Sequence, residues 1–532
     1  MVTAVYGIFE GGGAKGIAHI AGVKAAERSD LEFIGVAGAS AGALIAALIA
    51  VGYKADQIFD PESPSTNLLN RHSISPLSLL GGPEKWAMFE TSQRKAATVA
   101  KWAMRGGMAA AWLKSPGTVK VAREIASTGG FFDTEPVRHA LNEFLHTKLR
   151  MHHANAGRDI VVPERVRFRD IDPTVAPECC SLKVIVTDVT NRRMIVFGDM
   201  RQHGDVEVAE AVAASIAIPG VFKPARIPSY RHGPDALYAD GGLVSNLPIW
   251  VFAEEKLNYE RSALPCGKVP TLAFSLRDDE EDTVAPLNQN SFAYWVSTIR
   301  TAVFGGQTVA RLFAADLQPV QMAIRLRVTE FGFSTKRALE GYQDAYTDAA
   351  RSVVRNVRLF PANRTALLKA FHDNAIGLIR NNPKLNGISK IRIALVRPIP
   401  GTNSFRVEAS YNMDQDPDDR LIFSRLSEGA PVAFHGRAPT LLDLPTFSAS
   451  SIPPNMTKYE YALVRGNLVT AICLPIFADG VAWEDPVPDN RPPPLGVVSI
   501  DSVQPLDQLF AEVDAIKKLA TYSLTLAPAL EP

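Results

Sequence analysis

The chain has 532 residues, too many for one ordinary hydrophobic core, so two to four domains are expected. Hydrophobic residues make up 46% and charged residues 21% of it, proportions typical of globular proteins. Basic and acidic side chains balance at 56 each, so bulk charge indicates no nucleic-acid partner.

The cysteine pattern indicates neither a disulfide framework nor a C-x-x-C metal site. The four cysteines are Cys179, Cys180, Cys266 and Cys473. We expect reduced thiols in a cytoplasmic protein, because the N-terminus also lacks the segments of a secretory signal. Residues 34–53 approach the length of a membrane span, but Ser40 and clustered glycines interrupt them, so no span is expected.

The N-terminal part alternates predicted strands and helices. The order strand, glycine-rich turn, helix occurs twice, at residues 4–9, 11–16 and 17–28, then at 33–36, 38–42 and 43–51. Further strands are predicted at residues 182–189, 194–197 and 271–275, and a helix at 206–216. This alternation favours a largely parallel sheet with helices on both faces.

Residues 54–128 have a different character, and we expect them to form a variable insertion, either a lid or a membrane-contacting element. Serine, proline and glycine cluster first, and a predicted helix then mixes lysine and arginine with large apolar side chains. These are Trp86, Met88, Phe89, Trp102, Met104, Met108 and Trp112. Two interpretations stay open for residues 84–114: peripheral contact with anionic membranes, or a helix packed on its own domain.

The composition changes again near residue 360. We expect a first domain at residues 1–360, a linking helix within 361–385, and a β-rich α+β domain at 386–532. Strands of this last domain are predicted at residues 391–396, 405–411, 468–477 and 495–500, and a closing helix at 511–524.

The sequence Gly38-Ala39-Ser40-Ala41-Gly42 matches G-x-S-x-G between a predicted strand and a predicted helix. A nucleophile elbow requires this context, because the serine sits on a sharp turn where strand and helix approach closely. The helix N-terminus beneath the serine favours developing negative charge. The alternative is a packing turn of small residues, and the context favours a nucleophile.

A glycine loop precedes the elbow, with Gly11, Gly12, Gly13, Lys15 and Gly16 in the stretch GGGAKG. Successive glycines leave backbone N–H groups free to converge on an anion, such as the oxyanion formed in acyl transfer.

The same loop also fits the dinucleotide fingerprint G-x-G-x-x-G, with Asp30 and Glu32 near the spacing of a ribose-binding acid. A nucleotide-binding protein without hydrolase activity is therefore the rival interpretation, although it leaves Ser40 unexplained.

A catalytic serine needs a base, and no histidine is well placed to serve as one. Only His372 and His435 follow Asp240, and both lie outside or at the edge of the first domain, while His19 is expected to be an ordinary surface or packing residue. Asp240 stands in a tight turn with Gly241 and Gly242, and a carboxylate that accepts the serine proton directly can act as general base.

Taken together, GGGAKG, GASAG and DGG resemble the patatin-like phospholipase family, whose hallmarks are G-G-G-x-[KR]-G, G-x-S-x-G and D-G-[GA] in this order. Residues 129–141, 182–197, 208–227 and 329–345 also resemble family segments in the same succession, so the likeness spans residues 1 to about 355. The fold that this resemblance implies is a three-layer α/β/α sandwich with a largely parallel central sheet.

The resemblance implies phospholipase A-like hydrolysis of the fatty-acyl esters of membrane phospholipids, with no metal and no cofactor. Ser40 becomes the nucleophile and Asp240 the base of a dyad. The backbone N–H groups expected to form the oxyanion hole are those of Gly11, Gly12, Gly13 and Ala41. The residues expected to support the motifs are Lys15, Gly16, Gly38, Gly42, Gly241 and Gly242.

The C-terminal domain resembles a GAF-type sensory domain at residues 420–444 and in the strand pair 468–477 and 495–500. Such domains bind small ligands, including cyclic nucleotides, or mediate dimers. We therefore expect this domain to regulate the hydrolase through a nucleotide effector or through homo-oligomers. A signal-activated role in antiviral defence is a hypothesis by analogy.

Overall fold

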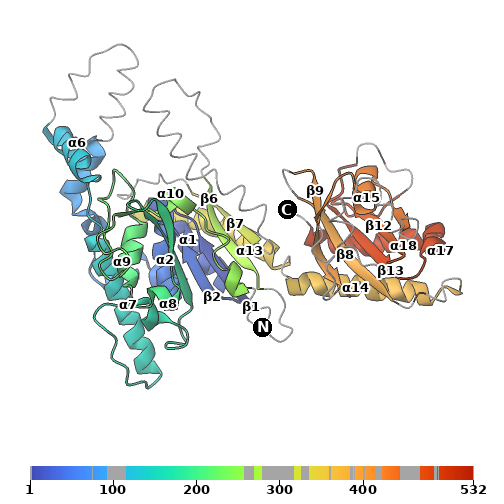
Figure 1. Cartoon of the computed structure of the whole chain (residues 1–532), viewed down its shortest axis with the longest axis horizontal. Coiled ribbons are helices and arrows are strands. Elements are labelled where there is room, and N and C mark those ends of the chain that lie inside the picture. The colour runs from blue at the N-terminus through green and yellow to red at the C-terminus, as the bar shows by residue number, and fades with distance from the viewer. Residues whose placement is uncertain are drawn as a thin grey trace, which may run out of the picture. The chain divides into compact units, whose positions relative to one another are not determined.

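The computed structural model describes most of the chain. The residues described are 3–74, 76–92, 116–256, 269–277, 317–324, 335–358, 361–383, 388, 390–399, 402–413, 422–443, 468–484, 488 and 491–530. The chain divides into two compact units, Met1–Val354 and Arg355–Pro532 (Figure 1).

The N-terminal unit is built on a largely parallel sheet with the strand order β4-β3-β2-β1-β6-β7, in which β5 pairs with β3. The parallel strands are β1 (Thr3–Phe9), β2 (Leu31–Gly38), β3 (Ser181–Asp188), β6 (Thr271–Arg277) and β7 (Leu317–Ala323). Two strands run antiparallel to β3, namely β4 (Arg193–Phe197) and β5 (Tyr238–Ala239). The predicted α/β class with a largely parallel central sheet is confirmed.

Helices connect these strands. They are η1 (Gly13–Gly16), α1 (Ile17–Glu27), α2 (Ala41–Ala50), α3 (Ala55–Ile58), η2 (Pro64–Thr66), α4 (Leu68–Arg71), η3 (Pro76–Leu80), α6 (Pro116–Thr128), α7 (Glu135–Asn155), η5 (Phe168–Ile171), α8 (Met200–His203), α9 (Val208–Ser215), α10 (Gly242–Ser245) and α13 (Thr335–Arg358). None of the described helices is both long enough and apolar enough to cross a bilayer.

Each face of the sheet is covered differently. On one face α1 and α2 lie against the strands (Figure 1). Gly22 of α1 leaves room there for the ring of Phe274. On the other face Tyr6 stacks on Phe252, with ring centroids 4.6 Å apart, within a cluster that residues 247–252 complete. Since β1 is buried on both faces, its apolar run is continuous rather than alternating.

The first part of the stretch proposed for membrane contact is packed inside the N-terminal unit. Residues 83–92 form a helix, and Trp86 and Phe89 on it are buried. Their rings lie 5.9 Å from Phe132 and 5.7 Å from Phe131 respectively. The packed-helix interpretation therefore holds for these two side chains. The other aromatic and methionine residues of the stretch beyond position 92 lie outside the described residues.

The C-terminal unit has an antiparallel sheet with the order β10-β9-β8-β13-β12-β11. Its strands are β8 (Ile391–Pro398), β9 (Ser404–Tyr411), β10 (Ile422–Ser424), β11 (Thr440–Asp443), β12 (Thr470–Ile476) and β13 (Gly496–Ser502). Its helices are α14 (Pro361–Arg380), α15 (Ala430–Gly436), α17 (Asp507–Ala511), α18 (Val513–Ser523) and η8 (Leu524–Ala529).

Helix α14, expected to be a linking helix, belongs to the core of the C-terminal unit. Leu368 and Phe371 on α14 are fully buried in one cluster with Leu474 of β12 and Ile500 of β13. Its apolar residues recur at helical spacing on one side, so the helix buries that side against the sheet. The likeness of this unit to GAF domains stays a prediction.

Candidate active site

Ser40 occupies a strained turn between β2 and α2. Its backbone dihedrals are φ 52° and ψ −128°, a conformation that residues with a side chain rarely adopt. A Cβ added at Gly38 would lie 2.3 Å from the carbonyl carbon of Gly42, and one at Gly42 would lie 2.3 Å from the carbonyl oxygen of Phe9. The glycines therefore let two strands and a helix meet at Ser40, as a nucleophile elbow requires.

Ser215, the last residue of α9, forms a hydrogen bond with the backbone of the Ser40 turn. The Ser40 N–H donates to Ser215 Oγ at 2.9 Å, and the Ser215 hydroxyl donates to the carbonyl of Ile185 at 2.6 Å. The Gly241 N–H donates to the Ser215 carbonyl at 3.1 Å. Ser215 thus ties the elbow to the Asp-Gly-Gly turn. Sequence reasoning missed this residue, although a serine closing a helix of small apolar residues was a signal.

Asp240 is fixed by its backbone. Its N–H donates to the carbonyl of Ala217 at 2.9 Å, and its own carbonyl accepts from the Thr187 hydroxyl at 2.7 Å. A Cβ at Gly241 would lie 2.0 Å from the carbonyl oxygen of Ile185, so only glycine fits there. The Gly242 N–H donates to Asp240 Oδ1 at 2.7 Å and fixes the orientation of the carboxyl group.

The Ser40 side chain lies close enough to Asp240 to affect its pKa, and burial sets the basicity of the carboxyl group. Burial raises the pKa of Asp240 to about 6, while the Ser40 side chain and then the Gly242 N–H oppose this rise. Oδ2 of Asp240 is buried and makes no hydrogen bond with any of the described residues. Oδ2 is therefore the oxygen available to accept a proton.

The glycine loop has one backbone N–H group that is already hydrogen-bonded and others that are available to a ligand. The Gly11 N–H donates to the carbonyl of Asn246 at 3.0 Å, so Gly11 does not offer this group to an oxyanion, contrary to expectation. Gly13 has φ 54°, which glycine adopts freely. The N–H groups of Gly12, Gly13 and Ala41 donate none of the hydrogen bonds found in the described residues, which leaves them available.

Buried polar groups hold this loop in place. The Glu10 carboxylate accepts from Asn246 Nδ2 at 3.0 Å and from the Leu276 N–H at 2.7 Å. His19 Nε2 donates to the Glu10 carbonyl at 2.7 Å, and burial lowers the pKa of His19 to about 4. His19 is therefore a neutral packing residue. Lys15 is buried as well.

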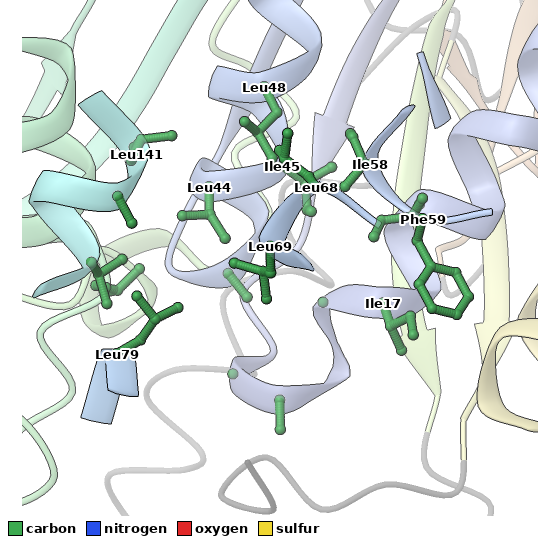
Figure 2. A pocket seen from close by; sticks show the side chains of 18 of the residues that line it. Ile17, Leu44, Ile45, Leu48, Ile58, Phe59, Leu68, Leu69, Leu79 and Leu141 are labelled. Atoms are coloured by element: carbon green, nitrogen blue, oxygen red, sulfur yellow. The ribbon is translucent and has the colours of Figure 1, made fainter. Parts of the chain in front are cut away.

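An apolar cavity of about 390 Å³ opens beside Ser40 and Gly13. Figure 2 shows Leu44, Ile45 and Leu48 projecting into it from α2, with Leu141 and Phe59 on opposite sides. The described residues that line it include no charged side chain and no histidine. The volume lies within the range of about 300–1,000 Å³ usual for small-molecule sites.

Among the described residues, no three His, Cys, Asp or Glu side chains gather closely enough to hold a metal ion. The residues around Ser40 can themselves supply nucleophilic attack by Ser40, proton acceptance by Asp240, and hydrogen bonding to an anion by backbone N–H groups.

Comparison with known proteins identifies relatives of this chain. Residues 7–253 match the family model described as patatin-like phospholipase. The uncharacterized protein YqhO of Bacillus subtilis (strain 168) is 30% identical over 261 residues, which cover 47% of this chain and 67% of that protein.

Two solved structures show a distant likeness. VipD from Legionella pneumophila is 16% identical with a TM-score of 0.31, and the match covers 67% of each chain. ExoU in its complex with SpcU, from Pseudomonas aeruginosa, is 15% identical with a TM-score of 0.33, covering 72% of this chain and 58% of that one. The matches to the family model and to YqhO show that the chain belongs to the patatin-like phospholipase family.

Proposed function

We propose that the chain is a serine lipid acyl hydrolase of the phospholipase A type, which cleaves fatty-acyl esters of membrane phospholipids. The observation that carries this proposal is the position of Ser40, a strained serine beside buried Asp240 at the mouth of an uncharged apolar cavity. A fatty-acyl chain matches such a cavity, because burying its methylenes contributes about 0.8 kcal/mol each.

The reaction follows from these positions. Ser40 Oγ attacks the ester carbonyl while its proton passes to Asp240 Oδ2, and the oxyanion is held by the N–H groups of Gly12, Gly13 and Ala41. Collapse of the intermediate expels the alcohol, which takes the proton and leaves as a lysophospholipid. Asp240 then deprotonates a water molecule, which attacks the acyl-enzyme. The bond from the acyl carbon to Ser40 Oγ breaks, the proton returns from Asp240 to Ser40 Oγ, and the fatty acid is released.

The dinucleotide alternative fits the cavity poorly. Gly13 and Gly16 of the loop face a space lined by apolar side chains such as Ile17. A pyrophosphate there would meet no cation among the described lining residues, whereas an acyl chain would meet mainly apolar side chains.

We also propose that the C-terminal unit regulates the hydrolase, in response to a nucleotide or other small ligand or by self-association, and that the protein works as a peripheral protein at membranes. The antiparallel sheet and separate core of this unit are compatible with a sensory module. A role as a signal-activated defence effector would be one use of such control.

Replacement of the nucleophile should abolish covalent labelling. We expect a long-chain fluorophosphonate to label the wild type and not Ser40→Ala, while Asp240→Asn lowers the labelling rate by on the order of 10²–10⁴-fold because the base is lost. Ser127→Ala, at an exposed serine at the end of α6, is the matched control and should label like the wild type. Labelling of a folded Ser40→Ala protein would contradict the assignment.

The pH dependence of hydrolysis should report Asp240. Because its pKa is raised to about 6 and only the ionised carboxylate accepts a proton, kcat/KM on a soluble ester should rise about tenfold per pH unit below pH 6 and level off above it. The same shift makes ionised Asp240 unfavourable for folding by roughly 3 kcal/mol above pH 6, a cost absent below about pH 4. Asp240→Asn should therefore be more stable than the wild type at pH 8. A rate profile that is flat from pH 5 to 7 would argue against Asp240 as base.

Leu48 should set the preferred acyl length. It lines the cavity two turns of α2 beyond Ser40, about 12 Å away along the helix. We expect Leu48→Ala to shift kcat/KM toward longer p-nitrophenyl esters and Leu48→Phe toward shorter ones, by about 10-fold or more. Ile49→Ala is the matched control, since Ile49 is buried on the same helix but does not line the cavity. Equal chain-length profiles for Leu48→Ala and Ile49→Ala would exclude this role.

A further inference from the structure

A cluster of arginines lies within the C-terminal unit, where α14 packs against β8 and β9. Arg397 of β8 and Arg406 of β9 are direct partners across the antiparallel ladder. The pairing then skips Glu408, which is the extra residue of a β-bulge. Bulges of this kind redirect a side chain, and they are frequent beside functional sites.

Among the described residues, one carboxylate, that of Glu408, pairs with this cluster. Arg364 Nη1 of α14 donates to Glu408 Oε1 at 2.7 Å, and Arg406 Nε donates to Glu408 Oε2 at 2.8 Å. The side chain of Arg364 is only 3% exposed, and its Nε is buried without a partner in the described part of the chain. The Arg397 side chain makes no hydrogen bond or ion pair with any described residue, although it is partly buried.

The charges of the cluster do not balance. Three guanidinium groups surround one carboxylate, so two positive charges are left over. Burial lowers the pKa of Arg397, and of the neighbours that affect it only Glu408 opposes this, while Arg364 and Arg406 lower it further. Like charges directly opposite each other in a sheet cost stability. Positions that break such a rule are where a function is expected.

We propose that Arg364, Arg397 and Arg406 bind a phosphoryl group, carried either by a small soluble molecule or by a lipid headgroup. A phosphate monoester carries about −1.5 to −2 charges at pH 7, which matches the two unbalanced positive charges better than a single carboxylate does. The planar guanidinium group donates two parallel hydrogen bonds to phosphate oxygens. Arg406 is 28% exposed and Arg397 partly exposed, so the ligand reaches them from solvent.

This site is made by residues of the C-terminal unit, whereas Ser40 belongs to the N-terminal unit, and the proposal does not depend on the hydrolase reaction. It lies in the unit proposed to be regulatory, and it gives that proposal a defined ligand chemistry.

Calorimetric titration of the full chain with pyrophosphate, and flotation with vesicles containing phosphatidic acid, test the site. We expect wild type to bind at least one probe and Arg397→Gln or Arg406→Gln to bind it at least tenfold more weakly. Binding should also weaken as salt concentration rises. Preference for pyrophosphate identifies a soluble ligand, and preference for the vesicles identifies a headgroup.

The matched control is Arg380→Gln, which removes the same charge from an exposed position at the other end of α14. It should bind like the wild type. Arg397→Lys keeps the positive charge but loses the planar guanidinium group, so we expect this variant to bind with intermediate affinity. It is also the substitution that disturbs packing least. No binding of either probe by wild type, or equal weakening in Arg380→Gln and Arg397→Gln, would overturn the proposal.

Discussion

The close approach of β1, β2 and α2 at Gly38 and Gly42 is the constraint on which the site depends. A side chain at either position would collide with backbone atoms of the neighbouring element. The approach holds Ser40 at a positive φ at the N-terminus of α2, where the positive end of the helix dipole favours developing negative charge. Strain of this kind costs about 1–3 kcal/mol, and the buried sheet around the turn maintains it.

Burial of the Asp240 carboxyl group is the second feature on which the site depends. It makes Asp240 more basic than an exposed aspartate, so the carboxyl group can take a proton from Ser40 near neutral pH. The same exclusion of water strengthens the hydrogen bonds offered to an oxyanion. In the proposed reaction the apolar cavity would supply that exclusion and receive the acyl chain, so substrate binding and proton transfer would share one environment.

The sequence predicted the parallel sheet and the position of Ser40 because local patterns specify both. The continuous apolar run of β1 and the small residues around Ser40 can be interpreted without long-range information. The role of Ser215 could not be found in this way, because it depends on contacts with Ser40 and Ile185. These partners lie 175 and 30 positions away from Ser215 in the sequence. For the same reason the sequence could not predict the hydrogen bond from the Gly11 N–H to the carbonyl of Asn246, which lies more than 200 residues later. The Arg397–Arg406 pair required the strand register and its bulge, which no sequence pattern disclosed.

The central claim is that Ser40 attacks an acyl ester whose chain lies in the cavity along α2. A crystal structure of the protein inactivated by a long-chain alkyl fluorophosphonate tests it most directly. The account predicts phosphorus on Ser40 Oγ, a phosphonyl oxygen about 3 Å from the N–H groups of Gly13 and Ala41, and the alkyl chain beside Leu48. Phosphorus bonded to another residue, or an alkyl chain directed away from the cavity, would contradict it.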